Sequence, residues 1–166
     1  MKIRATTTML VVLALAGCGS SKGGSTHASR TTPAVSPAQA AESAFASHAG
    51  LAFGTFNRYI YTPYRSGQFT AVAANKAALT RAALAARYVA TQLEQATAAA
   101  QSSAALAKLV PPLRVLGAGF RAALVKLRTG GFKMSEIQAA SIAISAIKGS
   151  AMNAGLQINE ATPSAI

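Results

Sequence analysis

The sequence predicts an all-α protein: an antiparallel, alanine-rich four-helix bundle preceded by a signal peptide and a flexible tether. Alanine, the strongest helix former, makes up about a quarter of the 166 residues. Apolar residues recur at three- and four-residue spacing in four stretches, while the alternating pattern of a half-buried strand is scarce. Because an alanine side chain buries little area, we expect a thin core and a narrow interior with little room for a ligand.

The chain opens with the pattern of a secretory signal peptide. Lys2 and Arg4 precede an apolar run over residues 9–16, and a small residue follows the run. This run of about eight residues is far shorter than the ~20 residues that cross a bilayer. The alternatives are an ordinary signal peptide cut near Ala16 and an uncleaved anchor.

The sequence Leu15-Ala16-Gly17-Cys18 ends this segment and holds the only cysteine of the chain. It resembles the lipobox of bacterial lipoproteins. The resemblance implies that the thiol of Cys18 carries diacylglycerol, with acyl chains such as palmitate, and that the chain is cut just before this cysteine. It also implies that the N-terminal lipid holds the protein on the extracytoplasmic face of the cell membrane.

Composition divides the chain into four segments. Residues 1–17 form the expected signal peptide. Residues 18–35 form a lipidated, disordered tether, because they are rich in glycine, serine and threonine. Residues 36–160 form the helical bundle, and residues 161–166 form a tail that we expect to fray.

The first helix is expected to begin at Ser36, which precedes a proline and can form a capping box with Gln39. Thr62-Pro63 should end it, because the residue before a proline disfavours helical dihedral angles. The second helix is expected from about Phe69 to about Ala100. Its expected buried residues are Val72, Leu79, Ala82, Ala86, Val89, Leu93 and Ala96.

Regularly spaced leucines predict the third helical region. We expect a short helix up to Leu109, a break or kink at Pro111-Pro112, and a helix from there to Thr129. Whether the two prolines break or only kink the helix is open. The expected buried residues are Leu106, Leu109, Leu113, Leu116, Phe120, Ala123 and Leu127.

The last helix is expected to open at Ser135, with Gln138 closing a capping box. Its expected buried residues are Ile137, Ala140, Ile144, Ile147, Ala151, Ala154 and Ile158. Four apolar faces joined by short turns favour an up-down-up-down bundle. The alternative is a pair of helical hairpins that completes its core by dimerising, so the oligomeric state stays open.

The chain is strongly basic, with a formal charge of +12 and only four acidic residues, all glutamate. Removal of Lys2 and Arg4 with the signal peptide leaves +10. A positive surface favours anionic lipid or an acidic envelope polymer as partner, and export argues against nucleic acid. The alternative is a basic surface that is merely solvated.

The sequence offers no set of residues typical of catalysis. Without aspartate, a nucleophilic triad or a pair of catalytic carboxylates has few candidate members. Glu42 and Glu136 are expected in first helical turns, where a carboxylate stabilises the helix dipole. His48, with Met134 or Met152 as axial partner, is a candidate metal or haem ligand, but no accompanying ligand motif supports it. We therefore expect no catalytic residue, no metal and no cofactor.

Three of the four tyrosines and two arginines gather at the expected end of the first helix: Arg58, Tyr59, Tyr61, Tyr64 and Arg65. Tyrosine offers a flat apolar face with a polar tip, and arginine binds phosphate with two parallel hydrogen bonds. These residues form a candidate surface contact. The alternative is a structural corner in which the rings pack and the hydroxyls bond loop carbonyls.

We expect a membrane-anchored lipoprotein of the cell envelope that acts as a non-catalytic binding or scaffolding module. The alternative is a helical bundle that binds a lipid or another small apolar ligand in its interior; a metal or haem protein using His48 is the third possibility. A dry cavity large enough for an acyl chain favours the second hypothesis, and a filled core favours the first.

Overall fold

The computed structural model describes residues 35–70, 75–129 and 133–166. All of them lie in the second of the two units into which the chain divides, residues 34–166. The expected signal peptide, Cys18 and the tether as far as residue 34 lie outside the described residues. The described part is mostly helical and contains no strand, which confirms the all-α class.

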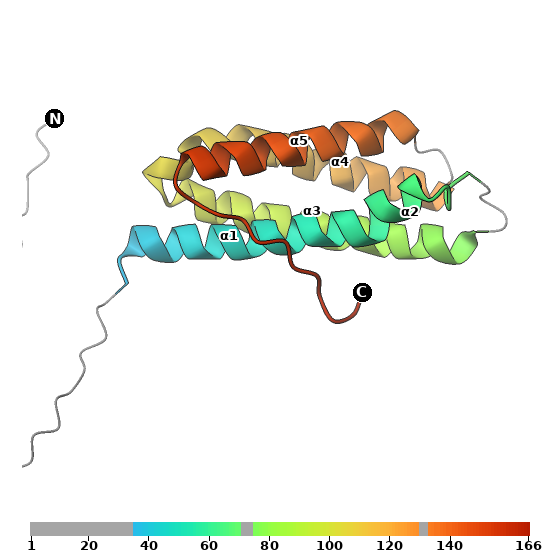
Figure 1. The fold of residues 1–166 in the computed structure, drawn as a ribbon, viewed down its shortest axis with the longest axis horizontal. Helices are drawn as coiled ribbons and strands as arrows, with labels where there is room; N and C mark the ends of the chain where they lie inside the picture. Colours follow the sequence, from blue (N-terminus) through green and yellow to red (C-terminus); the bar gives the residue numbers. More distant parts are fainter. Residues whose placement is uncertain (1–34, 71–74, 130–132) are drawn as a thin grey trace, which may run out of the picture. The chain divides into compact units, whose positions relative to one another are not determined.

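Four long helices make up most of this unit, joined by shorter helical pieces (Figure 1). In chain order the elements are α1 (Pro37–Phe56), the π-helix η1 (Asn57–Tyr61), α2 (Thr62–Arg65), α3 (Lys76–Gln101), the 3₁₀-helix η2 (Ala104–Leu109), α4 (Val110–Thr129) and α5 (Met134–Asn153).

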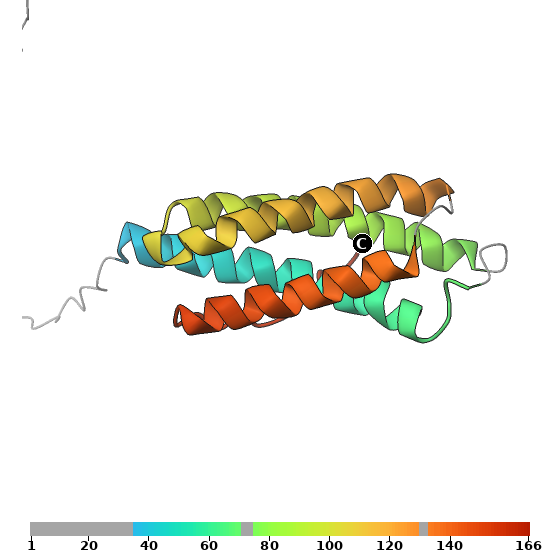
Figure 2. The ribbon, with the colours of Figure 1, turned by 90° about the horizontal axis from the view of Figure 1, so that it is seen from above.

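The helix α3 is central, because it packs extensively against both α1 and α4. The contacts of α5 are fewer and are made with α4, η1 and η2. Figure 2 shows α3 and α4 side by side along their length, with α5 on the other side of the unit. α1 and α4 are therefore held closely by α3, whereas α5 makes fewer contacts with the other helices.

The start of α1 confirms the expected capping box. The hydroxyl of Ser36 accepts a hydrogen bond from the N–H of Gln39 at 3.2 Å, and the side-chain carbonyl of Gln39 accepts the N–H of Ser36 at 3.1 Å. Two N–H groups that have no partner within the helix are thereby satisfied.

The expectation that Thr62-Pro63 ends the first helix is wrong. Thr62 keeps helical dihedral angles (φ −63°, ψ −48°), and its N–H bonds the carbonyl of Asn57, five residues back. In a regular α-helix the ring of Pro63 would clash with the carbonyl four residues earlier. The wider π-turn avoids that register, so the helical path continues through α2 to Arg65.

The second long helix begins later than expected, at Lys76 instead of Phe69. Phe69 lies instead in the turn after α2, where its side chain is only 2% exposed. Gly67 takes a positive φ of 75° in this turn, a conformation that glycine adopts at little cost. Val72, which the sequence predicts to be buried, lies outside the described residues.

The expected buried faces of α3, η2 and α4 are confirmed. Ala123 is half-buried, and the buried residues include Leu79, Ala82, Ala86, Val89, Leu93, Ala96, Leu106, Leu109, Leu113, Leu116, Phe120 and Leu127. Pro111 and Pro112 lie in the first turn of α4, where a missing N–H leaves no bond unmade. The break in the helical region therefore precedes the prolines, at residues 102–109.

The start of α5 differs from the expected box of Ser135 and Gln138. The helix begins at Met134, and the carboxylate of Glu136 accepts the N–H of Lys133 at 3.1 Å. Glu136 thus lies in a first turn as expected. The same expectation is wrong for Glu42, which lies further into α1 and accepts the hydroxyl of Ser103 at 3.0 Å.

The end of α5 also differs, because the helix stops at Asn153 and Ile158 is not helical. Gly155 takes a φ of 81°, the N–H of Leu156 bonds the carbonyl of Ala151, and the N–H of Gly155 bonds that of Met152. These two bonds are the glycine-dependent Schellman ending of a helix.

Residues 156–163, which we call the C-terminal segment, cross α1 after this ending (Figure 1). The N–H of Ala161, the first residue of the expected tail, donates to the carbonyl of Gly50 at 3.0 Å. A Cβ atom at Gly50 or at Gly54 would lie 2.2 Å from a carbonyl oxygen of this segment. Two glycines one turn apart therefore let the segment lie directly on the backbone of α1.

Candidate functional site

An apolar groove of about 560 Å³ lies between α4 and α5, and we call it the α4–α5 groove. Its floor includes Phe56 of α1, Ile60 of η1 and Ala86 of α3. The remaining lining residues come from α4, α5 and the residue before α5. They are Pro112, Val115, Leu116, Gly119, Phe120, Ala122, Ala123, Lys126, Leu127, Lys133, Glu136, Ile137, Ala139, Ala140 and Ala143.

Small side chains on both walls are the reason that this space stays open. On α5 the wall includes Ala139, Ala140 and Ala143, none of which is fully buried. On α4 a Cβ atom added at Gly119 would meet no atom within 4 Å. Methyl groups and a bare backbone cannot fill the distance between two helices, so the α4–α5 groove is left without side chains to occupy it.

The groove follows α4 over several helical turns. Its α4 wall runs from Pro112 to Leu127, roughly 22 Å at the rise of an α-helix. Val115, near the Pro112 end, is 73% exposed, so this end opens to solvent. The volume lies within the range of about 300–1,000 Å³ that is typical of small-molecule sites.

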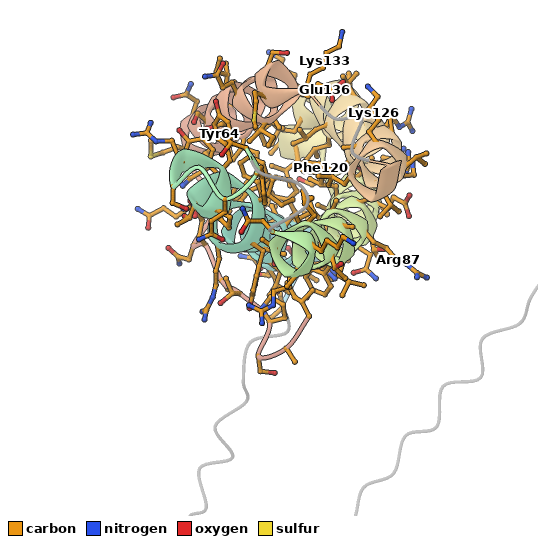
Figure 3. All side chains as sticks on the ribbon, turned by 90° about the vertical axis from the view of Figure 1, so that its right-hand side faces the viewer. Tyr64, Arg87, Phe120, Lys126, Lys133 and Glu136 are labelled. Atoms are coloured by element: carbon orange, nitrogen blue, oxygen red, sulfur yellow. The ribbon has the colours of Figure 1, made fainter. Side chains whose placement is uncertain are left out.

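The rings of Phe56 and Phe120 form part of the wall. The rings of Phe56 and Phe120 meet edge to face with their centroids 5.6 Å apart, and Tyr61 stacks on Phe56 at 5.9 Å. Figure 3 looks at this unit from the end where α5 begins, and Phe120 lies between the helices there. Rings fixed by such contacts provide a rigid apolar surface.

All charged lining residues lie where α4 approaches the start of α5. Lys126 of α4 forms an ion pair with Glu136 of α5, and Lys133 precedes α5. The hydrogen bond from Lys126, together with that from the backbone of Lys133, lowers the pKa of the Glu136 carboxyl below its ordinary value. Glu136 is therefore ionised near neutral pH and joins the two helices at this end.

The expectation of a narrow interior with little room for a ligand is wrong. We expected a narrow interior because alanine lets helices approach closely. The helix α3 does pack closely against its two neighbours, α1 and α4. Between α4 and α5 the same small residues leave a groove, because larger side chains of the partner helix do not fill the space. The pattern that could have indicated it is the run of alanines 139, 140 and 143 on α5.

The five residues of the candidate surface contact lie close together on η1 and α2, but they differ in exposure. Arg58 and Arg65 are exposed, whereas Tyr59, Tyr61 and Tyr64 are half-buried against the core. Arg58 lies over the ring of Tyr59 at 5.5 Å, and the rings of Tyr61 and Tyr64 are 6.2 Å apart. The site residues suggested by sequence thus adjoin the groove through Tyr61 and Phe56 without lining it.

His48 takes part in a side-chain hydrogen bond between helices. Its Nδ1 lies 2.9 Å from Oε1 of Gln92 on α3; Gln92 is buried and His48 is half-buried. Across the described ranges, no three histidine, cysteine or acidic side chains gather to hold a metal ion.

A second, smaller groove of about 280 Å³ lies between α3 and α4 on the outer surface. It is lined by Arg114 and Arg121, and Arg121 forms an ion pair with Glu94 across the two helices. Both partners of this pair are more than half exposed, so the interaction contributes little to stability.

No family model, no curated protein and no solved structure matches the chain. Among the described residues, no helix is both long and apolar enough to pass through a membrane.

Proposed function

We propose that the chain is a non-catalytic lipoprotein of the cell envelope whose helices bind a small apolar molecule in the α4–α5 groove. One observation carries the binding part: an elongated groove of about 560 Å³ with almost wholly apolar walls. Each methylene group transferred from water to such walls contributes about 0.8 kcal/mol. A cavity of this kind favours ligand binding over the alternative of a pure surface scaffold.

The proposal includes an antiparallel four-helix bundle as the architecture that creates the groove. The direction of each long helix can be followed by colour in Figure 1, and the directions alternate from α1 to α3, α4 and α5. The short connections at residues 102–109 and 130–133 support the same arrangement, since short loops join antiparallel neighbours.

Binding can be tested on the full chain with Cys18→Ser, so that no acyl chain of the protein itself competes. We expect 1-dodecanol to raise the melting temperature in a concentration-dependent way, because a ligand that binds only the folded state stabilises it. Gly119→Leu in the same background should abolish the shift, because the new side chain occupies the groove.

Gly149→Leu is the matched control. Gly149 also lies in a long helix with no atom within 4 Å of an added Cβ, but it does not line the groove. The Gly149→Leu variant should keep the rise in melting temperature that 1-dodecanol causes. Equal shifts with Gly119→Leu and with the parent would contradict binding in the groove.

The membrane anchor is the other half of the proposal and rests on the lipobox of the sequence. Lipid on Cys18 would hold the protein on the extracytoplasmic face of the cell membrane, with the basic surface near anionic lipid or acidic envelope polymers. We expect radioactive fatty acid to label the parent chain in cells and not the Cys18→Ser variant. Labelling of both chains would remove the anchor and leave the groove proposal untouched.

A further inference from the structure

We propose that the ligand of the α4–α5 groove is an anionic single-chain amphiphile, a long-chain carboxylate, whose head lies beside Lys133. This inference rests on the proposed function and adds the chemical class and the orientation of the ligand. It starts from the distribution of charge along the groove, which is uneven.

Every charged residue of the lining lies at one end. Lys126, Lys133 and Glu136 gather where α4 approaches the start of α5, and the walls beyond them are apolar as far as Pro112 and Val115. A wholly apolar ligand would make no polar contact with the charged side chains at this end. A wholly polar ligand would find no hydrogen-bonding group along the apolar remainder of the groove. An amphiphile matches both parts, with its head at the charged end and its chain along the roughly 22 Å of α4.

The sign of the head follows from the pairing of the three charges. Two are cations and one is an anion, and the carboxylate of Glu136 is already bonded by Lys126 and by the N–H of Lys133. The lowered pKa of Glu136 agrees with a carboxylate whose charge is already balanced. The ammonium group of Lys133 also attracts Glu136 but forms none of the ion pairs among the described residues, so two cations and one anion leave a net positive charge at this end.

The position of Lys133 suits a head that stays in water. Its side chain is exposed, and in Figure 3 it extends away from the helices above Glu136, while Phe120 lies between the helices. A carboxylate head can therefore keep most of its hydration and contact Lys133 at the rim, while the acyl chain occupies the apolar groove. Burial of an unpaired charge is avoided.

The test compares three probes of equal chain length on the full chain with Cys18→Ser: dodecanoate, 1-dodecanol and dodecyltrimethylammonium. We expect dodecanoate to bind about fivefold more tightly than dodecanol, the upper range for a contact with an exposed lysine. The advantage should diminish at high salt, because exposed charges are screened.

Lys133→Gln should remove the advantage of dodecanoate and leave the affinity for dodecanol unchanged. Lys108→Gln is the matched control: it removes one exposed lysine from η2, outside the groove, and should preserve the advantage. A loss with both variants would mean that net charge, not Lys133, attracts the carboxylate, and would overturn the proposed head position.

The remaining outcomes separate this inference from the proposed function. Equal binding of dodecanoate and dodecanol, both blocked by Gly119→Leu, would overturn the anionic head and retain the groove. Tighter binding of dodecyltrimethylammonium would assign the head to Glu136 and overturn the proposed sign. Binding of none of the three probes would overturn the proposed function itself.

Discussion

The interface between α3 and α4 and the space between α4 and α5 are built from the same kinds of residue but differ in packing. At the first, a Cβ added to Gly117 would lie 3.7 Å from the Cβ of Leu93, an ordinary packing distance. At the second, Gly119 has no neighbour within 4 Å, although it lies only two residues further along the helix. Small residues therefore produce close packing only where the partner helix supplies large ones.

The partner side chains explain the difference. On α3, leucine and valine alternate with alanine, and Leu93 and Val89 are completely buried. On α5, Ile144 and Ile147 are buried and do not line the groove, and the residues that do line it are alanines apart from Glu136 and Ile137. Three predictions test this contrast.

The largest effect is expected from truncating leucines on the two faces of α4. Leu113→Ala removes a side chain with no exposed surface and should lower the free energy of unfolding by about 3–5 kcal/mol, because the surroundings cannot close the cavity. Leu116→Ala should cost less, about 2 kcal/mol, because Leu116 is 6% exposed and borders the larger α4–α5 groove. Urea unfolding of both variants measures the difference; equal losses would mean that α4 is packed alike on both faces.

The second-largest effect on stability is expected from replacing two glycines by alanine: Gly54, which contacts the C-terminal segment, and Gly119, which faces open space. Gly54→Ala places a methyl group 2.2 Å from the carbonyl oxygen of Ala161, so it should cost about 1–3 kcal/mol and displace the C-terminal segment. Gly119→Ala meets nothing and should stabilise by up to about 1 kcal/mol, since alanine favours the helix. Thermal melting gives both signs, and destabilisation by both changes would show that the groove is filled.

The smallest effect is the dependence of stability on pH at the two ends of α5. Hydrogen bonds from lysine lower the pKa of Glu136, bonded to Lys126, and of Glu160, bonded to Lys148 at 2.7 Å, below the ordinary 4.5. A lowered folded-state pKa means that these carboxylates stabilise the fold above the unfolded-state pKa. This contribution is lost as the pH falls through the folded-state values.

The variant Glu136→Gln/Glu160→Gln isolates this contribution. Between pH 7 and about pH 3, we expect the melting temperature of the parent to fall by a few degrees more than that of the variant. The carboxylates are partly exposed, so solvent screening keeps the difference small. Parallel decreases would show that neither ion pair holds α5 in place.

Most of the buried faces of the helices followed from the sequence because they depend on local periodicity, although Ala154, expected to be buried, is exposed. Leu93, Leu113 and Ile147 are buried where the three- and four-residue spacing placed them. Ser36 caps α1 through a bond that spans three residues. The lack of aspartate, and of a ligand motif around His48, can also be read from the sequence, because these are properties of composition and spacing.

Tertiary structure alone decided the features that depend on distances between elements. Pro63 stays helical because a π-turn precedes it, and Gly155 ends α5 so that residues 156–163 can return to Gly50 and Gly54 on α1. The α4–α5 groove was likewise decided by tertiary structure. Periodicity fixes which face of a helix is apolar, but whether that face meets a side chain or an open space depends on the partner helix and on the connection that positions it.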